Sequence, residues 1–311
     1  MTISHPCEVC RAASTHLRVV RPGLAYCTCS ECGHALLVLR EEDPQVAFIN
    51  AQRRCYSSGV QALAFRQSLM DFESTAEHFR FFKRYVKQGD SVLESGPGFG
   101  DFIRLVLEQG HEVTAVEESP ELSEHLRQIE GVKVFSGTLE EGRLPGATYD
   151  MFCSFHVVEH VPDPEAHLRE AARLVRPGGI AIIATPSARS WQQVLLPQLS
   201  PNFDSAHLRV FSPRSLRTIA NRAGWDVVAE FTPEYTAGWL RVMSKLIRRA
   251  RGESEEQTAG KYAVARGGLW ALCFHSFQLV SLPIRLMQRS LRGGNEVLLV
   301  MARRGLDGTP H

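Results

Sequence analysis

The chain has 311 residues, of which 44% are hydrophobic and 22% charged, with 35 Lys and Arg against 34 Asp and Glu. This composition is typical of a globular protein and excludes disordered, collagen-like and coiled-coil chains. The formal net charge of +1 excludes a strong attraction of the whole chain to nucleic acid, although a local basic patch stays open. The length allows one large domain and an accessory module.

The first ten residues lack the basic start and following apolar stretch that mark a secretion signal. The longest apolar run, Leu269–Ile284, is interrupted by His275, Gln278 and Pro283. It is also short for a membrane-spanning helix, which needs about 20 apolar residues. We therefore expect a cytoplasmic protein.

Five of the eight cysteines lie within the first 32 residues. Two Cys-x-x-Cys pairs, separated by eighteen residues, predict a zinc site whose ligands are Cys7, Cys10, Cys29 and Cys32. Gly33 permits the tight turn after the second pair, and Cys27 is a spare thiol that could replace Cys29. Because four thiolates leave no open position on the metal, we expect a structural site in a zinc-ribbon-like module over residues 1–42.

Residues 43–89 are expected to form a helical linker or cap, because apolar residues recur at three- and four-residue spacing between Val60 and Val86. From residue 90 onward, β-rich runs alternate with helical patterns, which predicts an α/β fold with a parallel sheet covered on both faces. The predicted strands are Ser91–Ser95, Glu112–Glu117, Val132–Phe135, Tyr149–Phe155, Ile180–Thr185 and Trp225–Phe231. The predicted helices are Phe99–Gln109, Pro120–Ile129, Pro164–Val175 and Ser212–Ala223.

The segment VLESGPGFGDF, residues 92–102, reads as a strand, a glycine-rich turn and a helix start. Such a turn lets the backbone approach a ligand closely at the free N–H groups of the helix. A dinucleotide fingerprint would need a third glycine at position 101, but Asp101 stands there and would repel a pyrophosphate. Glu117 ends the next strand and can accept hydrogen bonds from both hydroxyls of a ribose. These features favour an adenosyl ligand without a pyrophosphate; the alternative is a plain α/β turn with a surface glutamate.

Four segments, VLESGPGFG, VTAVEES, YDMFCSF running into HVVEHVPDP, and LVRPGGIAIIATPS, resemble in order and spacing the signature segments of class I S-adenosylmethionine-dependent methyltransferases. The resemblance covers roughly residues 90–231. It implies a Rossmann-like, seven-stranded methyltransferase sheet with helices on both faces, whose last, antiparallel strand would be Asn295–Arg303. The methyltransferase domain would then span 90–311, with a helical lid or insertion over 232–293.

The same resemblance implies which residues surround the cofactor, S-adenosyl-L-methionine. They are Glu94, Gly96, Gly98, Gly100, Glu117, Thr138, Leu139, Glu140 and Phe155. The first four would surround the methionine part, the fifth would hold the ribose, and the next three would lie by the adenine. Phe155 and His156 would face the reacting sulfonium. A frequent aspartate of the family at the adenine site is Thr138 here.

Histidines near the end of the fourth strand are the candidate catalytic groups. His156 and His160 lie in SFHVVEHV, and histidine titrates near neutrality, so His156 is the preferred general base. The alternative is a structural histidine that shapes the cofactor pocket. Some relatives hold a divalent cation with Glu-x-x-Glu-His, but this chain has histidine at the first position, which disfavours Mg²⁺. His207, with Arg209, resembles acceptor-side residues of the family; anchoring of their loop is the alternative.

Two stretches near the C-terminus, Trp239–Arg251 and Leu269–Leu291, combine apolar residues with arginine and lysine. We expect them to form a lid of packed helices over the acceptor. The alternatives are a dimer interface or a peripheral contact of residues 239–292 with an anionic membrane.

Together these features predict transfer of a methyl group to a small-molecule acceptor, a saccharide or a natural-product intermediate, with O-methylation favoured. One alternative is an RNA or protein methyltransferase whose zinc head holds the macromolecule, although acidic residues offset the arginines of the head and no basic stripe emerges. A second is a non-catalytic cofactor-binding scaffold. The sequence predicts neither the acceptor atom nor the oligomeric state.

Overall fold

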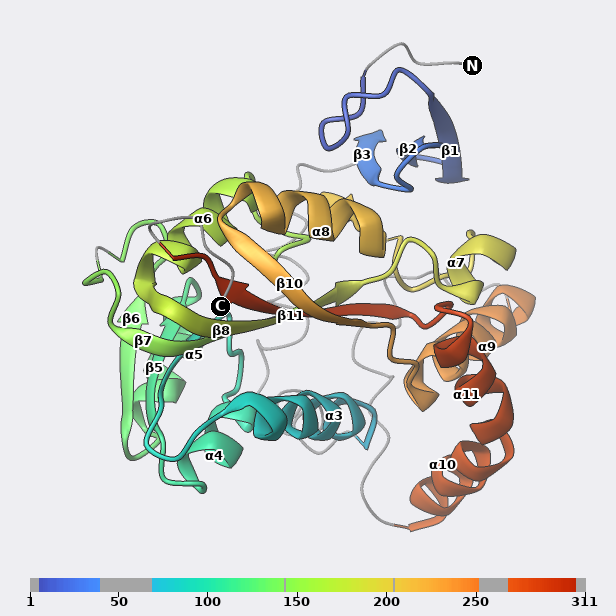
Figure 1. Cartoon of the computed structure of the whole chain (residues 1–311). Helices are drawn as coiled ribbons and strands as arrows, with labels where there is room; N and C mark the ends of the chain where they lie inside the picture. The colour runs from blue at the N-terminus through green and yellow to red at the C-terminus, as the bar shows by residue number, and fades with distance from the viewer. Residues whose placement is uncertain (1–5, 40–68, 143, 204, 252–267, 306–311) are drawn as a thin grey trace. The chain divides into compact units, whose positions relative to one another are not determined.

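A computed structural model describes residues 6–39, 69–142, 144–203, 205–251 and 268–305 (Figure 1). The first part of the expected helical linker, residues 43–68, lies outside the described residues. The chain divides into two compact units. The first comprises Met1–Ser74, Pro186–Ser215 and Phe231–Val297, and the second comprises Thr75–Thr185, Leu216–Glu230 and Leu298–His311. Within the described ranges, no helix combines the length and the apolar character that crossing a bilayer requires.

The second unit is built around a seven-stranded sheet in the order β10-β11-β8-β7-β4-β5-β6. Its strands are β4 (Ser91–Ser95), β5 (Glu112–Glu117), β6 (Val132–Ser136), β7 (Tyr149–Phe155), β8 (Val175–Pro186), β10 (Trp225–Phe231) and β11 (Glu296–Arg303). The pairs β4–β5, β5–β6, β4–β7 and β7–β8 are parallel. This sheet confirms the expected Rossmann-like methyltransferase fold. The strand order reverses between β4 and β7, and open α/β sheets bind ligands at the carboxyl ends of such strands.

Most strands of this sheet have the bounds predicted from the sequence, but β8 begins at Val175 rather than Ile180. The register against β7 shifts between Tyr149 and Met151. A Cβ at Gly179 would lie 2.5 Å from Val175 Cγ1 and 2.7 Å from Asp150 O, so only glycine fits there. The residues Arg-Pro-Gly-Gly, expected to separate helix and strand, therefore belong to the strand.

The expected helices of this region are confirmed with slightly shorter ends, as α4 (Asp101–Leu107), α5 (Pro120–Arg127), α6 (Pro164–Leu174) and α8 (Pro213–Arg222). Their starts follow from capping residues. Ser119 accepts a hydrogen bond from the Leu122 N–H, and Asp163 accepts from the N–H groups of the first turn of α6. A proline at the first turn follows each cap, where its missing N–H costs nothing. A longer helix, α3 (Leu69–Tyr85), precedes β4.

The first unit holds a four-stranded sheet in the order β1-β2-β3-β9. Its strands are β1 (Thr15–Arg21), β2 (Leu24–Cys29), β3 (Ala35–Leu39) and β9 (Arg209–Val210), and every neighbouring pair is antiparallel. The buried core beneath it combines residues of the head with residues far along the chain: Val20, Leu24, Tyr26, Ala35, Leu37, Phe203 and Val210. The cysteine-rich head thus shares its sheet and its core with residues 203–210.

Among its described residues, the first unit also contains the helices α7 (Trp191–Leu195), α9 (Thr236–Arg251), α10 (Gly268–Val280) and α11 (Leu282–Ser290). The last three cover the two basic, apolar stretches singled out in the sequence. They lie together in Figure 1, and α10 contacts both α9 and α11.

Candidate functional site

The glycine-rich turn between β4 and α4 depends on left-handed backbone at three positions. Gly96, Gly98 and Gly100 have φ values of 68°, 56° and 75°, which L side chains rarely adopt. A Cβ at Gly96 would lie 2.4 Å from a methyl group of Val157, and one at Gly100 would lie 2.8 Å from Leu126. A Cβ at Gly98 would meet no atom within 4 Å. The outer two glycines are therefore needed for packing, whereas the middle one borders open space where a ligand can approach the backbone.

Glu117 at the end of β5 closes one side of this turn. The side chain is 4% exposed, and its two oxygens accept hydrogen bonds from the N–H groups of Gly98 (3.2 Å) and Ser119 (2.9 Å). Burial raises the pKa of Glu117 to about 6, against the lowering effect of these two hydrogen bonds. The carboxylate is thus held in place beside the glycines, with part of its hydrogen-bonding capacity still available.

A second buried carboxyl group, Glu94, lies at the end of β4. It is 3% exposed, and its Oε2 has no hydrogen-bond partner among the residues that the structure describes. Burial, and then the charge of Glu117, raise the pKa of Glu94 well above its usual value. Two such acids at one turn favour a ligand that carries positive charge and hydroxyl donors.

These residues fit S-adenosylmethionine, which carries a sulfonium, an ammonium and a ribose with two hydroxyls. Its positive charge would stabilise the ionised forms of Glu94 and Glu117, and its hydroxyls would supply donors to Glu117. A pyrophosphate would instead add negative charge beside two buried acids. The electrostatics of the turn therefore favour the expected cofactor over a dinucleotide.

The three residues expected beside the adenine follow β6. Leu139 is 1% exposed, whereas the Thr138 N–H and hydroxyl form hydrogen bonds with Glu141. Glu140 bonds to the buried ring of His167, with 3.0 Å between Oε1 and Nδ1. Although partial burial acts in the opposite direction, this hydrogen bond lowers the pKa of Glu140. Glu140 is thus already engaged by a neighbouring helix, and Leu139 supplies an apolar surface.

Aromatic rings surround the end of β7. Phe155 stacks on His78 of α3, with ring centroids 4.2 Å apart and planes 6° from parallel. Phe102 contacts the Phe155 ring edge-on, with ring centroids 4.9 Å apart. His78 also lies 6.1 Å from His156, measured between ring centroids. Sequence reasoning missed His78, because it occupies an ordinary position in an amphipathic helix.

The candidate base His156 directly follows Phe155 and has a φ of 58°, which is uncommon for a residue with a Cβ. Its N–H donates to the Ala184 carbonyl at 2.8 Å, which ties this conformation to the sheet. Its Nδ1 lies 3.5 Å from Glu159 Oε1, and the imidazole is 46% exposed. Backbone strain of this kind is typical of functional sites.

Glu159 is fully buried and lies between two of the candidate histidines. Its Oε2 accepts a hydrogen bond from the Thr185 hydroxyl at 2.9 Å, and its Oε1 lies 3.9 Å from Nε2 of His160. A buried carboxylate fixed on one side by Thr185 can orient the imidazole of His156 on the other. Glu159 belongs to the His-x-x-Glu-His motif whose use as a divalent-cation site the sequence disfavours, and its position allows it to orient His156 instead.

The third candidate histidine, His207, belongs to the first unit. Its Nδ1 lies 2.8 Å from the Asn202 carbonyl oxygen, and its own carbonyl accepts a hydrogen bond from the Tyr26 hydroxyl at 2.8 Å. Its neighbour Arg209 pairs with Glu8 of the head at 2.7 Å. His207 and Arg209 thus connect their loop to the cysteine-rich sheet.

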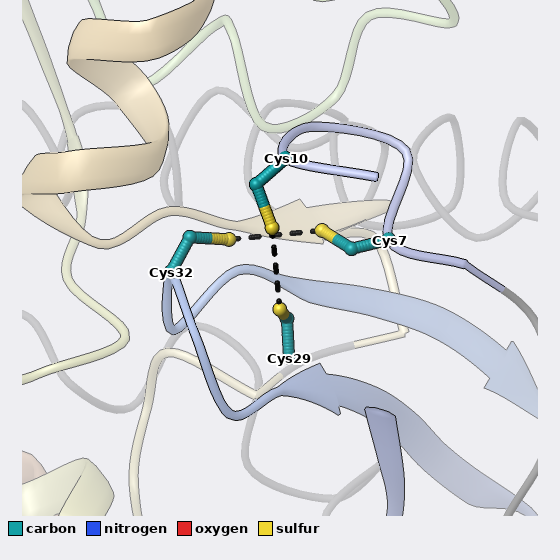
Figure 2. A group of neighbouring side chains, drawn as sticks. All are labelled: Cys7, Cys10, Cys29 and Cys32. Carbon is teal, nitrogen blue, oxygen red and sulfur yellow. Dashed lines mark hydrogen bonds between the residues drawn. The ribbon is translucent and has the colours of Figure 1, made fainter. Parts of the chain in front are cut away.

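Four thiols of the head converge on one point (Figure 2). They belong to the predicted ligands Cys7, Cys10, Cys29 and Cys32, whose sulfurs all lie within 4.8 Å of one another. The Sγ–Sγ distance is 3.6 Å from Cys7 to Cys32 and 3.5 Å from Cys10 to Cys29. Tetrahedral zinc with Zn–S bonds of about 2.3 Å separates its sulfurs by about 3.8 Å. The four thiols fit that ion, and Cys27 is not among them.

The turns that carry the thiols have the same shape. Gly33 after the second pair has a φ of 73°, and Arg11 after the first pair has a φ of 63°. The Gly33 N–H donates to the Cys29 carbonyl and the Arg11 N–H donates to the Cys7 carbonyl, each at 2.9 Å. Each Cys-x-x-Cys pair therefore turns back on itself, as a zinc knuckle requires.

Polar contacts tie the thiol cluster to β9 and the turn after it. Glu8, between the first two cysteines, accepts hydrogen bonds at 2.7 Å from Arg209 and forms one of equal length with the buried ring of His34. Although burial opposes it, these partners lower the pKa of Glu8 to about 2. The Ser212 hydroxyl also donates to the Cys32 carbonyl. The cluster and the β9 segment therefore form one structure.

The region that carries the sheet and the glycine turn is similar to known methyltransferases. A family model described as a methyltransferase domain matches residues 64–230, which is more than half of the chain. The malonyl-[acyl-carrier protein] O-methyltransferase of Serratia marcescens is 35% identical over 114 residues, which are 34% of this chain and 45% of that protein. A probable S-adenosylmethionine-dependent methyltransferase of Mycolicibacterium smegmatis is 29% identical over 140 residues, covering 45% of this chain and 53% of that protein.

Among solved structures, a chain from the complex of the Haloferax volcanii Trm112 methyltransferase activator with a methyltransferase superposes with a TM-score of 0.51. The two chains are 15% identical, and the match covers 82% of this chain and 97% of the other, a likeness that shows the fold alone. The chain spans about half the length of the curated relatives named above. Together with the match over residues 64–230, the seven-stranded sheet and its glycine turn show that this chain belongs to the methyltransferase family, of the class I, S-adenosylmethionine-dependent kind.

Proposed function

We propose that the protein transfers a methyl group from S-adenosylmethionine to an oxygen atom of a small-molecule acceptor. The observation that carries the proposal is the pair of buried acids, Glu94 and Glu117, beside the open backbone at Gly98. The O-methyltransferase activity in the name of the Serratia marcescens relative supports the choice of oxygen. A saccharide or a natural-product intermediate is the acceptor class that we favour.

His156 is the proposed general base. When bound, S-adenosylmethionine supplies an electrophilic methyl group on its sulfonium. Glu159 lies 3.5 Å from Nδ1 of His156 and, held by Thr185, orients the ring so that Nε2 takes the proton from the acceptor hydroxyl. The acceptor oxygen, once it has lost its proton, would be the nucleophile for the methyl group that the cofactor supplies, and the imidazolium of His156 would return its proton to water.

The four thiolates of the head are proposed to hold one structural zinc ion. The mutual distances of the four sulfurs support this assignment. With four protein ligands, the ion would have no position for a substrate, so its contribution would be to the folding of the head and of β9.

The test of this function separates cofactor binding from turnover in a His156→Ala variant. We expect its affinity for S-adenosylmethionine, measured by calorimetry, to stay within about twofold of the unaltered protein. Formation of S-adenosylhomocysteine with a panel of sugars and phenols should fall about a hundredfold or more, because a positioned base contributes at least that factor. The exposed His275 of α10 provides the matched control as His275→Ala.

Equal loss of binding and turnover in His156→Ala would contradict a function as base and favour a pocket-shaping histidine. An unaltered protein that binds S-adenosylmethionine but forms no S-adenosylhomocysteine with any hydroxylated acceptor would contradict the proposed reaction.

A further inference from the structure

Helix α11 has its polar side chains inside and its apolar side chains outside. Arg285 is 5% exposed and Gln288 is fully buried. The apolar residues of the same helix are between 40% and 51% exposed, and they are Leu282, Ile284, Leu286 and Met287. A helix on the surface of a globular protein normally has the reverse arrangement, with its apolar stripe facing the core.

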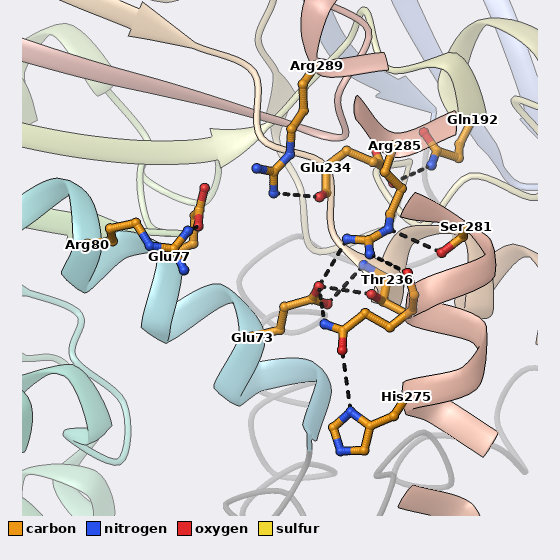
Figure 3. A network of polar contacts seen from close by, with 11 residues as sticks. Glu73, Glu77, Arg80, Gln192, Glu234, Thr236, His275, Ser281, Arg285 and Arg289 are labelled. Carbon is orange, nitrogen blue, oxygen red and sulfur yellow. Dashed lines mark hydrogen bonds and ion pairs between the residues drawn. The ribbon is translucent and has the colours of Figure 1, made fainter. Parts of the chain in front are cut away.

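The buried polar face is fixed by specific partners (Figure 3). Arg285 donates to Glu73 Oε1 at 3.2 Å and to the Gln278 carbonyl at 2.8 Å. The side chain of Gln288 accepts a hydrogen bond from the Trp239 indole at 2.7 Å. Rotating α11 to bury its apolar residues would break the buried ion pair of Arg285 with Glu73, which is strongly unfavourable. The outward direction of the apolar residues is therefore built into the fold.

The exposed apolar residues extend beyond α11 at both ends. Leu279 and Val280 close α10 with 72% and 81% exposure, and Leu291 follows α11 with 65%. We call these residues the apolar ridge, comprising Leu279, Val280, Leu282, Ile284, Leu286, Met287 and Leu291. So many large apolar side chains exposed within thirteen positions mark an interaction surface rather than an ordinary protein surface.

The charge of the surrounding helices indicates what the apolar ridge contacts. The sequences of α9, α10 and α11 contain no aspartate or glutamate. Exposed arginines of these segments, among the side chains that the structure describes, include Arg249 and Arg251 at the end of α9 and Arg292 after α11. Apolar side chains with cations and without acids are complementary to an anionic lipid surface.

A second copy of the chain fits this surface less well. In a two-fold symmetric dimer each patch faces its own copy, so that the basic helices would face like charge and no acid of α9, α10 or α11. A bilayer interface fits both the apolar side chains and the arginines, because acyl chains can contact the leucines and lipid phosphates can bind the arginines.

We propose that the apolar ridge docks on the surface of an anionic lipid bilayer and holds the protein there as a peripheral membrane protein. The contact lies in the first unit and needs neither the cofactor nor the zinc ion, so it stands apart from the proposed methyl transfer. It selects the membrane alternative for residues 239–292 from those that the sequence left open.

Flotation with lipid vesicles tests this proposal. We expect the full chain to float with vesicles of equal parts phosphatidylcholine and phosphatidylglycerol, and to release them as salt is raised. Leu286→Gln combined with Leu291→Gln should weaken this binding at least about tenfold, because two exposed leucines lose their apolar contact. Arg292→Gln should weaken it about fivefold. The matched control is Val228→Gln on β10, which is 56% exposed outside the ridge and should bind as the unaltered protein does.

Circular dichroism of each variant shows that the fold is retained, since the altered side chains are exposed. Failure of the unaltered protein to float with anionic vesicles would overturn the proposal, as would equal binding by the leucine variant. Light scattering adds a further test. A dimer that the leucine variant converts to monomers would show that the ridge is a subunit interface instead.

Discussion

The glycine turn and the thiol cluster are both candidate ligand sites built on tight turns, but they are encoded differently. The three glycines of the first site and its two buried acids lie within Glu94–Glu117, a segment of 24 residues that forms one strand–helix–strand unit. The thiol cluster is also local in its ligands, yet its supporting contacts come from β9, where Arg209 lies 201 positions from its partner Glu8. The glycines and acids of the first site come from one continuous segment, whereas the thiol cluster is supported by a segment far along the chain.

The difference teaches how much of each site a local pattern can predict. A strand followed by Gly-x-Gly-x-Gly and a distant acid predict both the backbone shape and the class of ligand. Two Cys-x-x-Cys pairs predict a metal, but not the segment that completes the sheet beside them. Variants that alter each site separately can test whether the two sites are independent.

The largest effect is expected from removing a thiolate. Cys29→Ser should abolish binding of one zinc ion per chain, because structural zinc contributes about 10 kcal/mol or more to the folding of such modules. Metal analysis of the purified protein measures the loss, and hydrogen exchange should show that β1, β2 and β3 lose protection. Binding of S-adenosylmethionine should persist, since its proposed residues belong to the other unit.

Cys27→Ser is the matched control for this experiment. Cys27 is buried in the same sheet but is not one of the four clustered thiols, so this variant should keep its zinc. Absence of zinc from the unaltered protein, or loss of cofactor binding in Cys29→Ser, would contradict the separation of the two sites.

A smaller effect is expected at the cofactor turn. Glu117→Ala should raise the dissociation constant for S-adenosylmethionine about a hundredfold, because it removes two hydrogen bonds to a charged acceptor at about 1.5 kcal/mol each. Calorimetry measures the change, and the zinc content should not change. The adjacent Glu118 is exposed, and Glu118→Ala should alter the affinity little. A similar loss in both variants would point to general electrostatics rather than to a ribose contact.

The smallest effect is a dependence of the same affinity on pH. The pKa of Glu117 is raised by burial to about 6, so its carboxylate is ionised well above that pH and becomes protonated as the pH falls through it. Because the ionised form accepts the ribose hydrogen bonds, the affinity should be complete near pH 7.5 and about tenfold weaker near pH 5. Calorimetry at the two pH values checks the change, and Glu117→Gln should reduce it. An unchanged affinity near pH 5 would exclude this titration.

Much of the sheet could be predicted because its strands are short, apolar and bounded by turn residues. The predicted bounds of Ser91–Ser95, Glu112–Glu117 and Tyr149–Phe155 agree with the structure. The predicted start of β8 at Ile180 was wrong, because the strand begins at Val175 and a Pro-Gly-Gly sequence usually marks a turn. The strand β9 has only two residues and no periodic pattern to reveal it.

The candidate cofactor site could likewise be predicted only where a local sequence pattern determines the structure. Left-handed backbone at three glycines follows from the sequence, because only glycine adopts it readily. The stacking of His78 on Phe155, and the position of Glu159 between Thr185 and His156, depend on the packing of segments that no local pattern connects. The assignments of the base and of the adenine contacts stay predictions.

Because β9 completes the sheet of the head, the cysteine-rich segment 1–42 does not contain its whole sheet and would not keep its structure if moved to another protein. Residues 1–42 fused to another protein would present the bare edge of β3, with backbone N–H and C=O groups that Arg209 and Val210 satisfy here. An open edge of this kind recruits other strands and promotes aggregation. Substitutions in the head and in the segment that carries His207 therefore act on the same sheet, although the two segments lie far apart in the sequence.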